Sequence, residues 1–225
     1  MQNSKLDNLA ITLPEQKNYE VSYGLAIKLA AERLNDLSDL AEQCRRSGST
    51  CDMPDKSQLI SLTYLNRTYQ IHLPDVAFSL TDSVEPVEIR DKILILNYFL
   101  RAKGTPLSHR LIAYQELQEG STYYPTFVKR AVKPLIDFFG NTPEKLLDVS
   151  AKLGGFPANY GDVAVTIPAF ARVPVTLVLW AGDDEFPPNA NILFDSTILD
   201  YLSAEDINVL CQTISWKLVK LLPES

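Results

Sequence analysis

Three consecutive carboxylates follow directly after a predicted strand, in the segment WAGDDEFPP at 180–188. Asp183, Asp184 and Glu185 supply the oxygen ligands that hard cations such as Mg²⁺ or Ca²⁺ prefer. We expect Asp195 to return across a short loop beside them as a further oxygen ligand. Two other interpretations stay open: an acceptor cluster for a cationic or hydrogen-bonding ligand, and a solvated tight turn in which Gly182 takes unusual backbone angles.

Four more side chains have chemistry that suits a binding site, and each also has a structural explanation. His109, at the start of an element, is either a ligand or general base, or a hydrogen-bonded structural histidine. Arg172, between two predicted strands, either binds an anion or pairs with the acidic segment. Tyr123 and Trp180 offer aromatic surface to a planar ligand, although aromatic residues at a helix start usually pack.

The sequence lacks the best-marked catalytic motifs. It contains no glycine-rich phosphate loop, no G-x-S-x-G elbow and no H-E-x-x-H helix. Two histidines and three cysteines cannot build a histidine-rich zinc site or a four-cysteine iron–sulfur cluster. Cys44 and Cys211 fall on predicted core faces and are expected to be buried, inert thiols, whereas Cys51 in a loop is the candidate reactive thiol.

Charge and composition limit the classes of partner. The chain has 225 residues and a formal net charge of −7, which argues against nucleic acid or an anionic membrane as the main partner. Neither an apolar run of about 18 residues nor a signal-peptide pattern occurs, so no membrane span is predicted. The three cysteines are too few, and odd in number, for a disulfide scaffold. This pattern is typical of reduced thiols and predicts a cytoplasmic location.

The N-terminal two thirds of the chain alternates helical and strand patterns. We expect an N-terminal extension at 1–19, a long helix at 20–46 and a hairpin at 59–73 with its turn at Asn66-Arg67. A second helix is predicted at 86–103, and 109–117 fits either a strand or a helix. Further helices are predicted at 123–139, with a kink at Pro134, and from Thr142 to Gly154.

The residue pattern of the C-terminal third predicts strands at 162–167, 173–180 and 192–194. The second of these is apolar on both faces, which places it centrally in a sheet. Ser203 and Asp206 form a capping box for the last helix. Val209 and Trp216 make a second apolar stripe on that helix, which indicates either a homodimer contact or cover by the rest of the domain. We therefore predict one α+β domain at 20–225, with a mainly antiparallel sheet packed against several helices.

The C-terminal motifs together resemble a bacterial and archaeal family known only as a domain of unknown function. The shared signature is W-x-G-D-x-E-F-P from Trp180, then I-L-F-D at 192–195, then Y-L-x-x-E-D at 201–206. The resemblance extends from about Glu20 onward and is tightest between Asp162 and Leu210. The resemblance implies that relatives occur in anaerobes and that some of them are fused to the iron–sulfur domain of corrinoid iron–sulfur proteins. This sequence has neither that fusion nor its four-cysteine motif.

Three functions follow from these patterns. The first is a non-enzymatic binding or accessory protein for a small cofactor, and the family resemblance implies a corrinoid or another tetrapyrrole as the ligand. Its site would be lined by His109, Tyr123, Arg172, Trp180, Asp183, Asp184, Glu185 and Asp195. The second is an enzyme that uses the carboxylates, with or without a divalent cation, on a small organic substrate. The third is a structural or partner-binding subunit.

Overall fold

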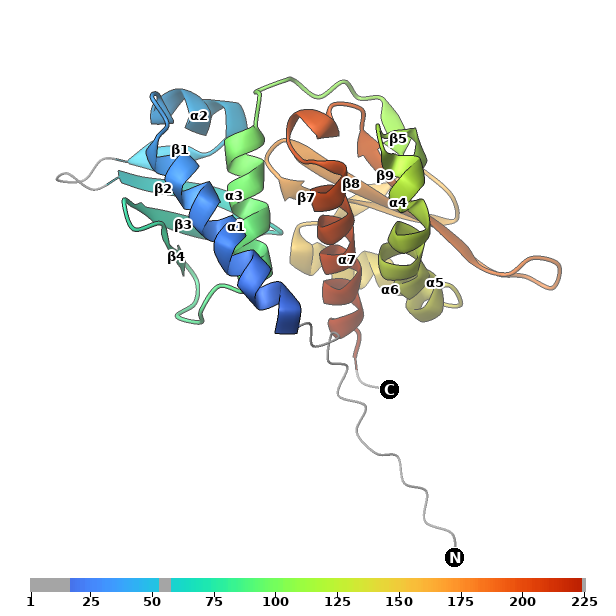
Figure 1. The fold of residues 1–225 in the computed structure, drawn as a ribbon. Coiled ribbons are helices and arrows are strands. Elements are labelled where there is room, and N and C mark those ends of the chain that lie inside the picture. The colour runs from blue at the N-terminus through green and yellow to red at the C-terminus, as the bar shows by residue number, and fades with distance from the viewer. Residues whose placement is uncertain (1–16, 53–57, 224–225) are drawn as a thin grey trace, which may run out of the picture.

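In the computed structural model, which describes residues 17–52 and 58–223, nine strands form one open antiparallel sheet in the order β4-β3-β2-β7-β8-β9-β5 (Figure 1). β1 adds to β2 and β6 adds to β7. The strands are β1 (Thr50–Asp52), β2 (Gln58–Tyr64), β3 (Arg67–Leu73), β4 (Ala77–Leu80), β5 (Leu111–Ala113), β6 (Phe156–Ala158), β7 (Val163–Phe170), β8 (Val173–Trp180) and β9 (Asn189–Asp195). The predicted α+β class and antiparallel sheet are confirmed.

Helices cover one face of this sheet (Figure 1). The α-helices are α1 (Lys17–Asn35), α2 (Leu40–Ser47), α3 (Ile89–Arg101), α4 (Gly120–Phe127), α5 (Lys133–Phe139), α6 (Lys145–Ser150) and α7 (Ala204–Lys220). Short 3₁₀ turns, η1 (Tyr114–Glu116), η3 (Ala151–Leu153) and η4 (Ile198–Asp200), and a π-helical turn, η2 (Val128–Val132), join them. Within the described ranges no helix has both the length and the apolar character needed to cross a membrane.

The two halves of the sheet meet at a single residue pair, Tyr64 of β2 and Phe170 of β7. Their rings stack with centroids 4.7 Å apart, and Tyr98 of α3 stacks on the other side of Phe170 at 4.0 Å. Tyr201 continues the column at 6.0 Å from Tyr98. Because these four rings are 1% exposed or less, aromatic packing joins the halves where backbone pairing is sparse.

The predicted long helix at 20–46 is wrong, because the chain forms two helices there. Residues 36–39 interrupt the helical pattern, and Asp39 caps α2 by accepting a hydrogen bond from the Glu42 N–H at 2.9 Å. An aspartate favours such a cap over a helix interior. Gly48 ends α2 in the left-handed conformation. On α1, Leu25 and Leu29 are exposed, whereas Leu34 is buried.

The remaining local predictions hold with shifted boundaries. The hairpin at 59–73 is β2–β3, but its two turn residues are Leu65 and Asn66, both with positive φ. Residues 109–117 contain both predicted states, a short strand followed by a 3₁₀ turn. The helix at 123–139 is interrupted by the π-helical turn η2 just before Pro134, which lacks the N–H that a regular α-helix needs there. Residues 1–16 of the predicted extension lie outside the described residues, and α1 begins at Lys17 within it.

The C-terminal predictions are the most accurate. β8 lies between β7 and β9 near the middle of its half of the sheet, as its apolar faces predict. The capping box of α7 is present, with Ser203 Oγ accepting from the Asp206 N–H at 3.1 Å. Val209 and Trp216 are half-buried, and the Trp216 indole meets the edge of Phe138 with centroids 6.2 Å apart. β1, β4 and β6, three of the shorter strands, were not predicted, and β9 is longer than expected.

Candidate functional site

The hairpin of β8 and β9 projects beyond the body of the protein (Figure 1). Its last strand pair is Trp180 with Asn189, and the intervening loop at 181–188 carries the three carboxylates. Asp162, at the start of β7, holds the base of the loop: its Oδ2 accepts a hydrogen bond from the Ala181 N–H at 2.8 Å. The acidic segment is therefore anchored to the sheet on both sides.

Asp183 builds the turn at the tip of this hairpin. Its Oδ1 accepts hydrogen bonds from the N–H groups of Glu185, at 2.9 Å, and Phe186, at 2.7 Å. These bonds from Phe186 and Glu185 lower the pKa of Asp183, because they favour the ionised carboxylate. Asp184 and Glu185 are exposed beside it. The tight-turn interpretation is thus correct for Asp183, whose carboxylate already has two partners.

Close packing holds the loop in place. Gly182 does not take a positive φ, contrary to the sequence-based expectation. Its lack of a side chain matters instead, since a Cβ there would lie 2.7 Å from Pro188 Cδ. On its other side Pro188 meets Gly140 at the end of α5, where a Cβ would lie 2.7 Å from Pro188 Cβ. Pro188 is therefore clamped between two glycines, which fixes the hairpin loop relative to the body.

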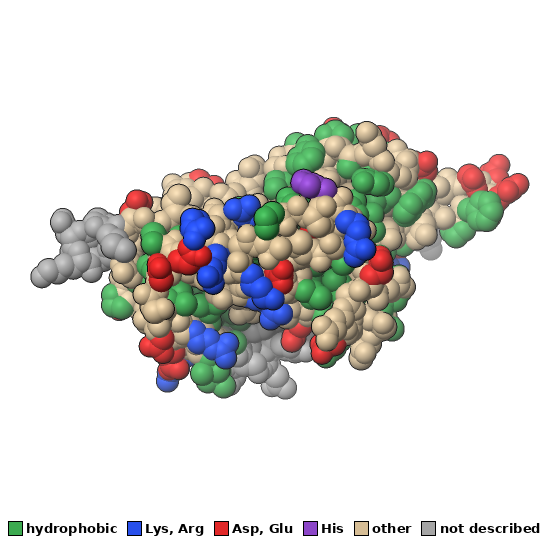
Figure 2. Space-filling view, turned by 90° about the horizontal axis from the view of Figure 1, so that it is seen from above, with side chains coloured by type: hydrophobic (Ala, Val, Ile, Leu, Met, Phe, Trp, Pro, Cys, Tyr) green, Lys and Arg blue, Asp and Glu red, His purple; other side chains and the backbone are tan. Residues whose placement is uncertain are grey.

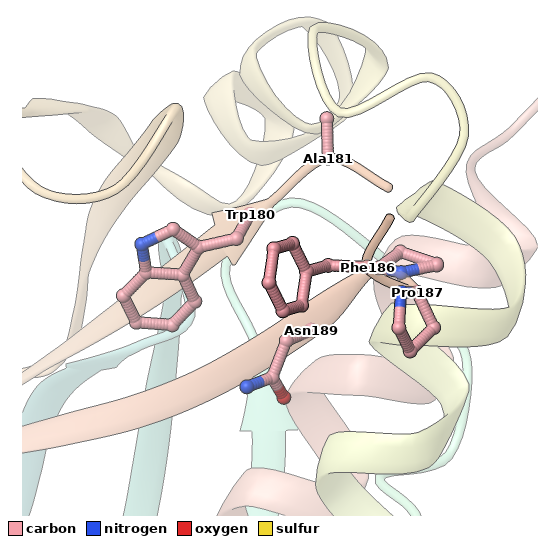
Figure 3. A pocket seen from close by; sticks show the side chains of 6 residues that line it. Trp180, Ala181, Phe186, Pro187 and Asn189 are labelled. Atoms are coloured by element: carbon pink, nitrogen blue, oxygen red, sulfur yellow. The ribbon is translucent and has the colours of Figure 1, made fainter. Parts of the chain in front are cut away.

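The clamp leaves an aromatic depression open to solvent (Figure 3). Trp180, Ala181, Phe186, Pro187, Pro188 and Asn189 line a volume of about 520 Å³. The Trp180 and Phe186 side chains stand on either side of it, with Asn189 below them (Figure 3). Trp180 is 39% exposed and Phe186 is 67% exposed. So much aromatic surface in water is unfavourable, at about 25 cal/mol per Å², unless a ligand covers it.

The charged residues of the loop that carries this depression are all acidic. Between Arg172 and Lys217 the sequence contains no lysine, arginine or histidine. The same stretch holds seven carboxylates, of which Asp183, Asp184 and Glu185 lie at the hairpin tip. Figure 2 shows acidic side chains together with hydrophobic ones at the end of the projecting hairpin, while basic side chains gather over the middle of that face. The long gap between basic residues was a signal in the sequence that motif reasoning missed.

Asp195 lies at the other end of β9 from the acidic tip, so the expectation that it returns beside Asp183–Glu185 is wrong. β9 pairs with β8 as a regular hairpin, which sets Asn189 and Asp195 roughly 20 Å apart at about 3.3 Å per residue. The Asp195 carboxylate, 4% exposed, instead ties β9 to the segment before β5. Its oxygens accept bonds from the N–H groups of Ser108 (3.1 Å), His109 (2.7 Å) and Thr197 (3.0 Å) and from both hydroxyls, Ser108 Oγ and Thr197 Oγ1.

These hydrogen bonds decide the charge state of Asp195. Burial by itself would raise the pKa of Asp195, but the bonds from Thr197 and Ser108 outweigh it and lower the pKa to about 2. The carboxylate is therefore ionised at neutral pH. His109 meets Asp195 with its backbone N–H and not with its imidazole, which is exposed. Its φ of 59° is unusual for a histidine and is held by this bond.

Arg172 and Tyr123 lie apart from the hairpin tip. Arg172 precedes β8, at the opposite end of that strand from Trp180. Its Nε would lie 3.7 Å from a Cβ at Gly48, the left-handed residue that ends α2. A cation at a helix C-terminus is favourable, which gives Arg172 a structural role there. Tyr123 is 46% exposed on α4.

The structure therefore brings four of the eight predicted site residues together and separates the others. Trp180, Asp183, Asp184 and Glu185 share the hairpin tip, whereas His109 and Asp195 share the end of β9 near β5. Among the described side chains, no group of three or more His, Cys, Asp and Glu is placed to hold a metal ion. Sequence reasoning missed Phe186 and Asn189 as members of the depression, although Phe186 lies inside the quoted signature.

Fold and site together define an α+β protein with an open antiparallel sheet and an acidic, aromatic hairpin that projects from its body. The chain belongs to the family described as Domain of unknown function (DUF3786), whose sequence model matches residues 39–216. The resemblance inferred from the C-terminal motifs is thereby confirmed at the level of the family. No curated protein and no solved structure matches the chain significantly.

Proposed function

We propose that the protein is a non-enzymatic binding protein whose β8–β9 hairpin docks a segment of a partner protein that carries basic and apolar side chains. The observation that carries the proposal is the depression between Trp180 and Phe186, set beside the exposed carboxylates of Asp184 and Glu185. Among the functions expected from the sequence, this is the partner-binding one. A cytoplasmic location, with reduced thiols, belongs to the same proposal.

The apolar part of the surface is prepared for binding. The Asp183 turn and the Pro188 clamp hold Phe186 and Trp180 in position before a partner arrives. A fixed loop loses little conformational freedom on association, so more of the contact free energy appears as affinity. Tryptophan and other aromatic side chains at the centre of an interface commonly contribute most of its binding free energy.

The charge of the surface selects the partner. The hairpin and the residues around it carry carboxylates without a neighbouring lysine or arginine in the sequence from 173 to 216. A partner segment with arginine or lysine beside an apolar anchor complements this surface, and attraction between the charges speeds their encounter. Such an interaction weakens as salt rises, because exposed charges are screened over about 8 Å at physiological ionic strength.

The test is selection of random peptides displayed on phage against the purified full chain, with Phe186→Ala protein used to remove unspecific binders. We expect the selected peptides to combine arginine or lysine with an aromatic or aliphatic residue. Synthetic versions should bind Phe186→Ala and Trp180→Ala at least about tenfold more weakly than the wild type. Tyr123→Ala is the matched control, since it removes an equally exposed aromatic side chain from α4.

Two double variants test how much the carboxylates contribute to peptide binding. Asp184→Asn combined with Glu185→Gln keeps the Asp183 turn and should weaken peptide binding most at low salt. Glu32→Gln combined with Asp36→Asn removes two exposed carboxylates at the end of α1 and should leave binding unchanged. Selected peptides without a basic bias, or equal binding by wild type and Phe186→Ala, would overturn the proposal.

The second candidate is a small planar cofactor, with a corrinoid or another tetrapyrrole as the expected ligand. The volume of about 520 Å³ between two aromatic rings favours it, because pockets for small ligands commonly measure about 300–1,000 Å³. Titration with cobalamin and with haem, followed by absorbance, tests it. A saturable micromolar spectral shift that Trp180→Ala abolishes and His109→Ala leaves intact would support this candidate.

The other sequence-based functions have less support at this site. An enzyme that uses the acidic segment would have to work with Asp184 and Glu185, since Asp183 is occupied by its turn. A homodimer through Val209 and Trp216 stays a prediction. Its contact surface would include Phe138, which is 40% exposed beside the Trp216 indole. Light scattering on the wild type and Trp216→Ala compares their molar masses and tests that contact.

A further inference from the structure

Two of the three cysteines lie at one junction between a helix and a strand. Cys44 is on the buried face of α2 and is 3% exposed. Cys51, on β1, pairs with the fully buried Ile60 of β2. Because directly opposed residues of antiparallel strands point to the same side of a sheet, Cys51 faces the core side as Ile60 does. Cys51 is half-buried and packs against the core that contains Cys44.

The chain between them reverses sharply. Gly48 takes a φ of 70°, and the Ser49 N–H donates to the Cys44 carbonyl at 2.8 Å. The strand that follows therefore runs back beside α2, and this brings Cys51 close enough to Cys44 for the two thiols to influence each other's ionisation. A disulfide between them would bring the two sulfur atoms to about 2.05 Å.

From this geometry we propose that Cys44 and Cys51 form a reversible dithiol–disulfide pair, in which Cys51 reacts first with a peroxide and Cys44 then closes the disulfide. The role is independent of the hairpin surface. It extends the sequence-based expectation for Cys51 and changes that for Cys44, which is buried but has a thiol partner. Cys211 is fully buried on α7 and serves as the internal reference thiol.

The solvent accessibility of the two thiols decides which cysteine reacts first. The thiolate is the reactive form of cysteine. Burial is the main cause that raises the pKa of Cys44 to about 12, and the neighbouring Cys51 adds to the rise, so Cys44 is a poor first nucleophile. Cys51 is the more accessible of the two sulfurs.

The chemistry balances with a peroxide as the oxidant. The Cys51 thiolate attacks one peroxide oxygen, the O–O bond breaks, and a sulfenic acid and hydroxide form. The Cys44 thiol gives up its proton and attacks the Cys51 sulfur, so that the S–S bond forms and the S–O bond breaks. The released hydroxide takes up the proton as water. Two electrons pass from the two sulfurs to the peroxide oxygens, and an added dithiol such as dithiothreitol reverses the change.

The sequence allows the pair to be detected directly. Trypsin cuts after Arg33, Arg45 and Lys56, so Cys44 and Cys51 fall in separate peptides. After mild peroxide treatment of the full chain, we expect these peptides to appear joined under non-reducing conditions. The thiol count of the unfolded protein should fall from three to one and return to three with dithiothreitol. Cys211→Ser should form the same linked pair.

Dimedone, which traps sulfenic acids, tests the order of the steps. Cys44→Ser should accumulate labelled Cys51, because no thiol remains to close the disulfide, whereas Cys51→Ser should show no label on Cys44. Circular dichroism checks that both variants fold, and the peptide map of the wild type needs neither. Oxidised wild type that carries sulfinic acid at Cys51, or that links two chains, without the internal pair would overturn the proposal.

Discussion

Lys217 on α7 reaches the buried carboxylate of Asp91 on α3, with 3.3 Å between Nζ and Oδ2. Tyr64 of β2 donates its hydroxyl to the other oxygen of the same carboxylate, also at 3.3 Å. Asp91 is 3% exposed. One acidic side chain thus connects a helix and a strand of the N-terminal half to the last helix of the C-terminal half, close to the aromatic column that joins the two parts of the sheet.

Lys217→Met is expected to destabilise the protein by about 2–3 kcal/mol near pH 8, because it leaves a buried carboxylate without its cation. Burial raises the pKa of Asp91, and Lys217 opposes that rise. A raised folded-state pKa means that stability falls as pH increases from the unfolded value through the folded one. Without Lys217 this fall becomes larger, so the difference from wild type should grow between pH 5 and pH 8.

Urea unfolding across this pH range measures that effect. Asp91→Asn combined with Lys217→Met is the control: it removes the buried charge together with its cation and should recover most of the lost stability. A single Lys217→Met variant that unfolds at the wild-type urea concentration at pH 8 would show that the pair contributes nothing.

Asp195→Ala is expected to cost about 2–4 kcal/mol at pH 7, because the N–H groups of Ser108, His109 and Thr197 lose their acceptor. The pKa of Asp195 is lowered to about 2, so its charge stabilises the fold above its ordinary pKa and ceases to do so as pH falls from about 4 to 2. The difference between wild type and variant should therefore shrink in acid. Asp184→Ala, at an exposed position, should change the free energy of unfolding by less than about 0.5 kcal/mol.

Local patterns predicted the elements but not their long-range pairing. The alternation at 59–73 and the doubly apolar run at 173–180 are local properties, and both gave correct strands. Asp195 was misplaced because its partners at Ser108 and His109 lie 87 and 86 residues away, and no short-range rule encodes the pairing of β9 with β5. The broken helix at 36–39 was missed because hydrophobic spacing continues across the break while the Asp39 cap decides the boundary.

The same distinction applies to the candidate site. The signature around Trp180 located the exposed hairpin, because it is a continuous segment whose residues stay together in any fold. His109, Tyr123 and Arg172 were grouped with it by residue type alone. The structure places each of them in a different part of the fold, His109 before β5, Tyr123 on α4 and Arg172 before β8. Backbone contacts or solvent exposure account for each position.

His109→Gly separates a structural role from a ligand role for this histidine. The backbone N–H, which holds Asp195, is kept, and glycine accepts a φ of 59° without strain. Relief of that strain, about 1 kcal/mol, is offset by the greater freedom of glycine in the unfolded chain, so stability should change by less than about 1 kcal/mol. Thermal unfolding measures it. A loss of several kcal/mol would show that the imidazole makes a contact on which the fold depends.

Gly182→Ala tests whether the fixed shape of the hairpin loop matters for binding. The new Cβ would lie 2.7 Å from Pro188 Cδ, so Pro188 must move, at an expected cost of about 1–3 kcal/mol. Because Trp180 and Phe186 are retained, any weaker binding of the selected peptides reports loss of prepared geometry rather than loss of contact area.

Gly24→Ala on α1 is the matched control, since nothing lies within 4 Å of a Cβ added there and alanine favours a helix. Urea unfolding and peptide titration should therefore show Gly24→Ala slightly more stable with unchanged affinity, and Gly182→Ala less stable with reduced affinity. Equal peptide affinity in the two variants would mean that the loop does not need its clamp to bind.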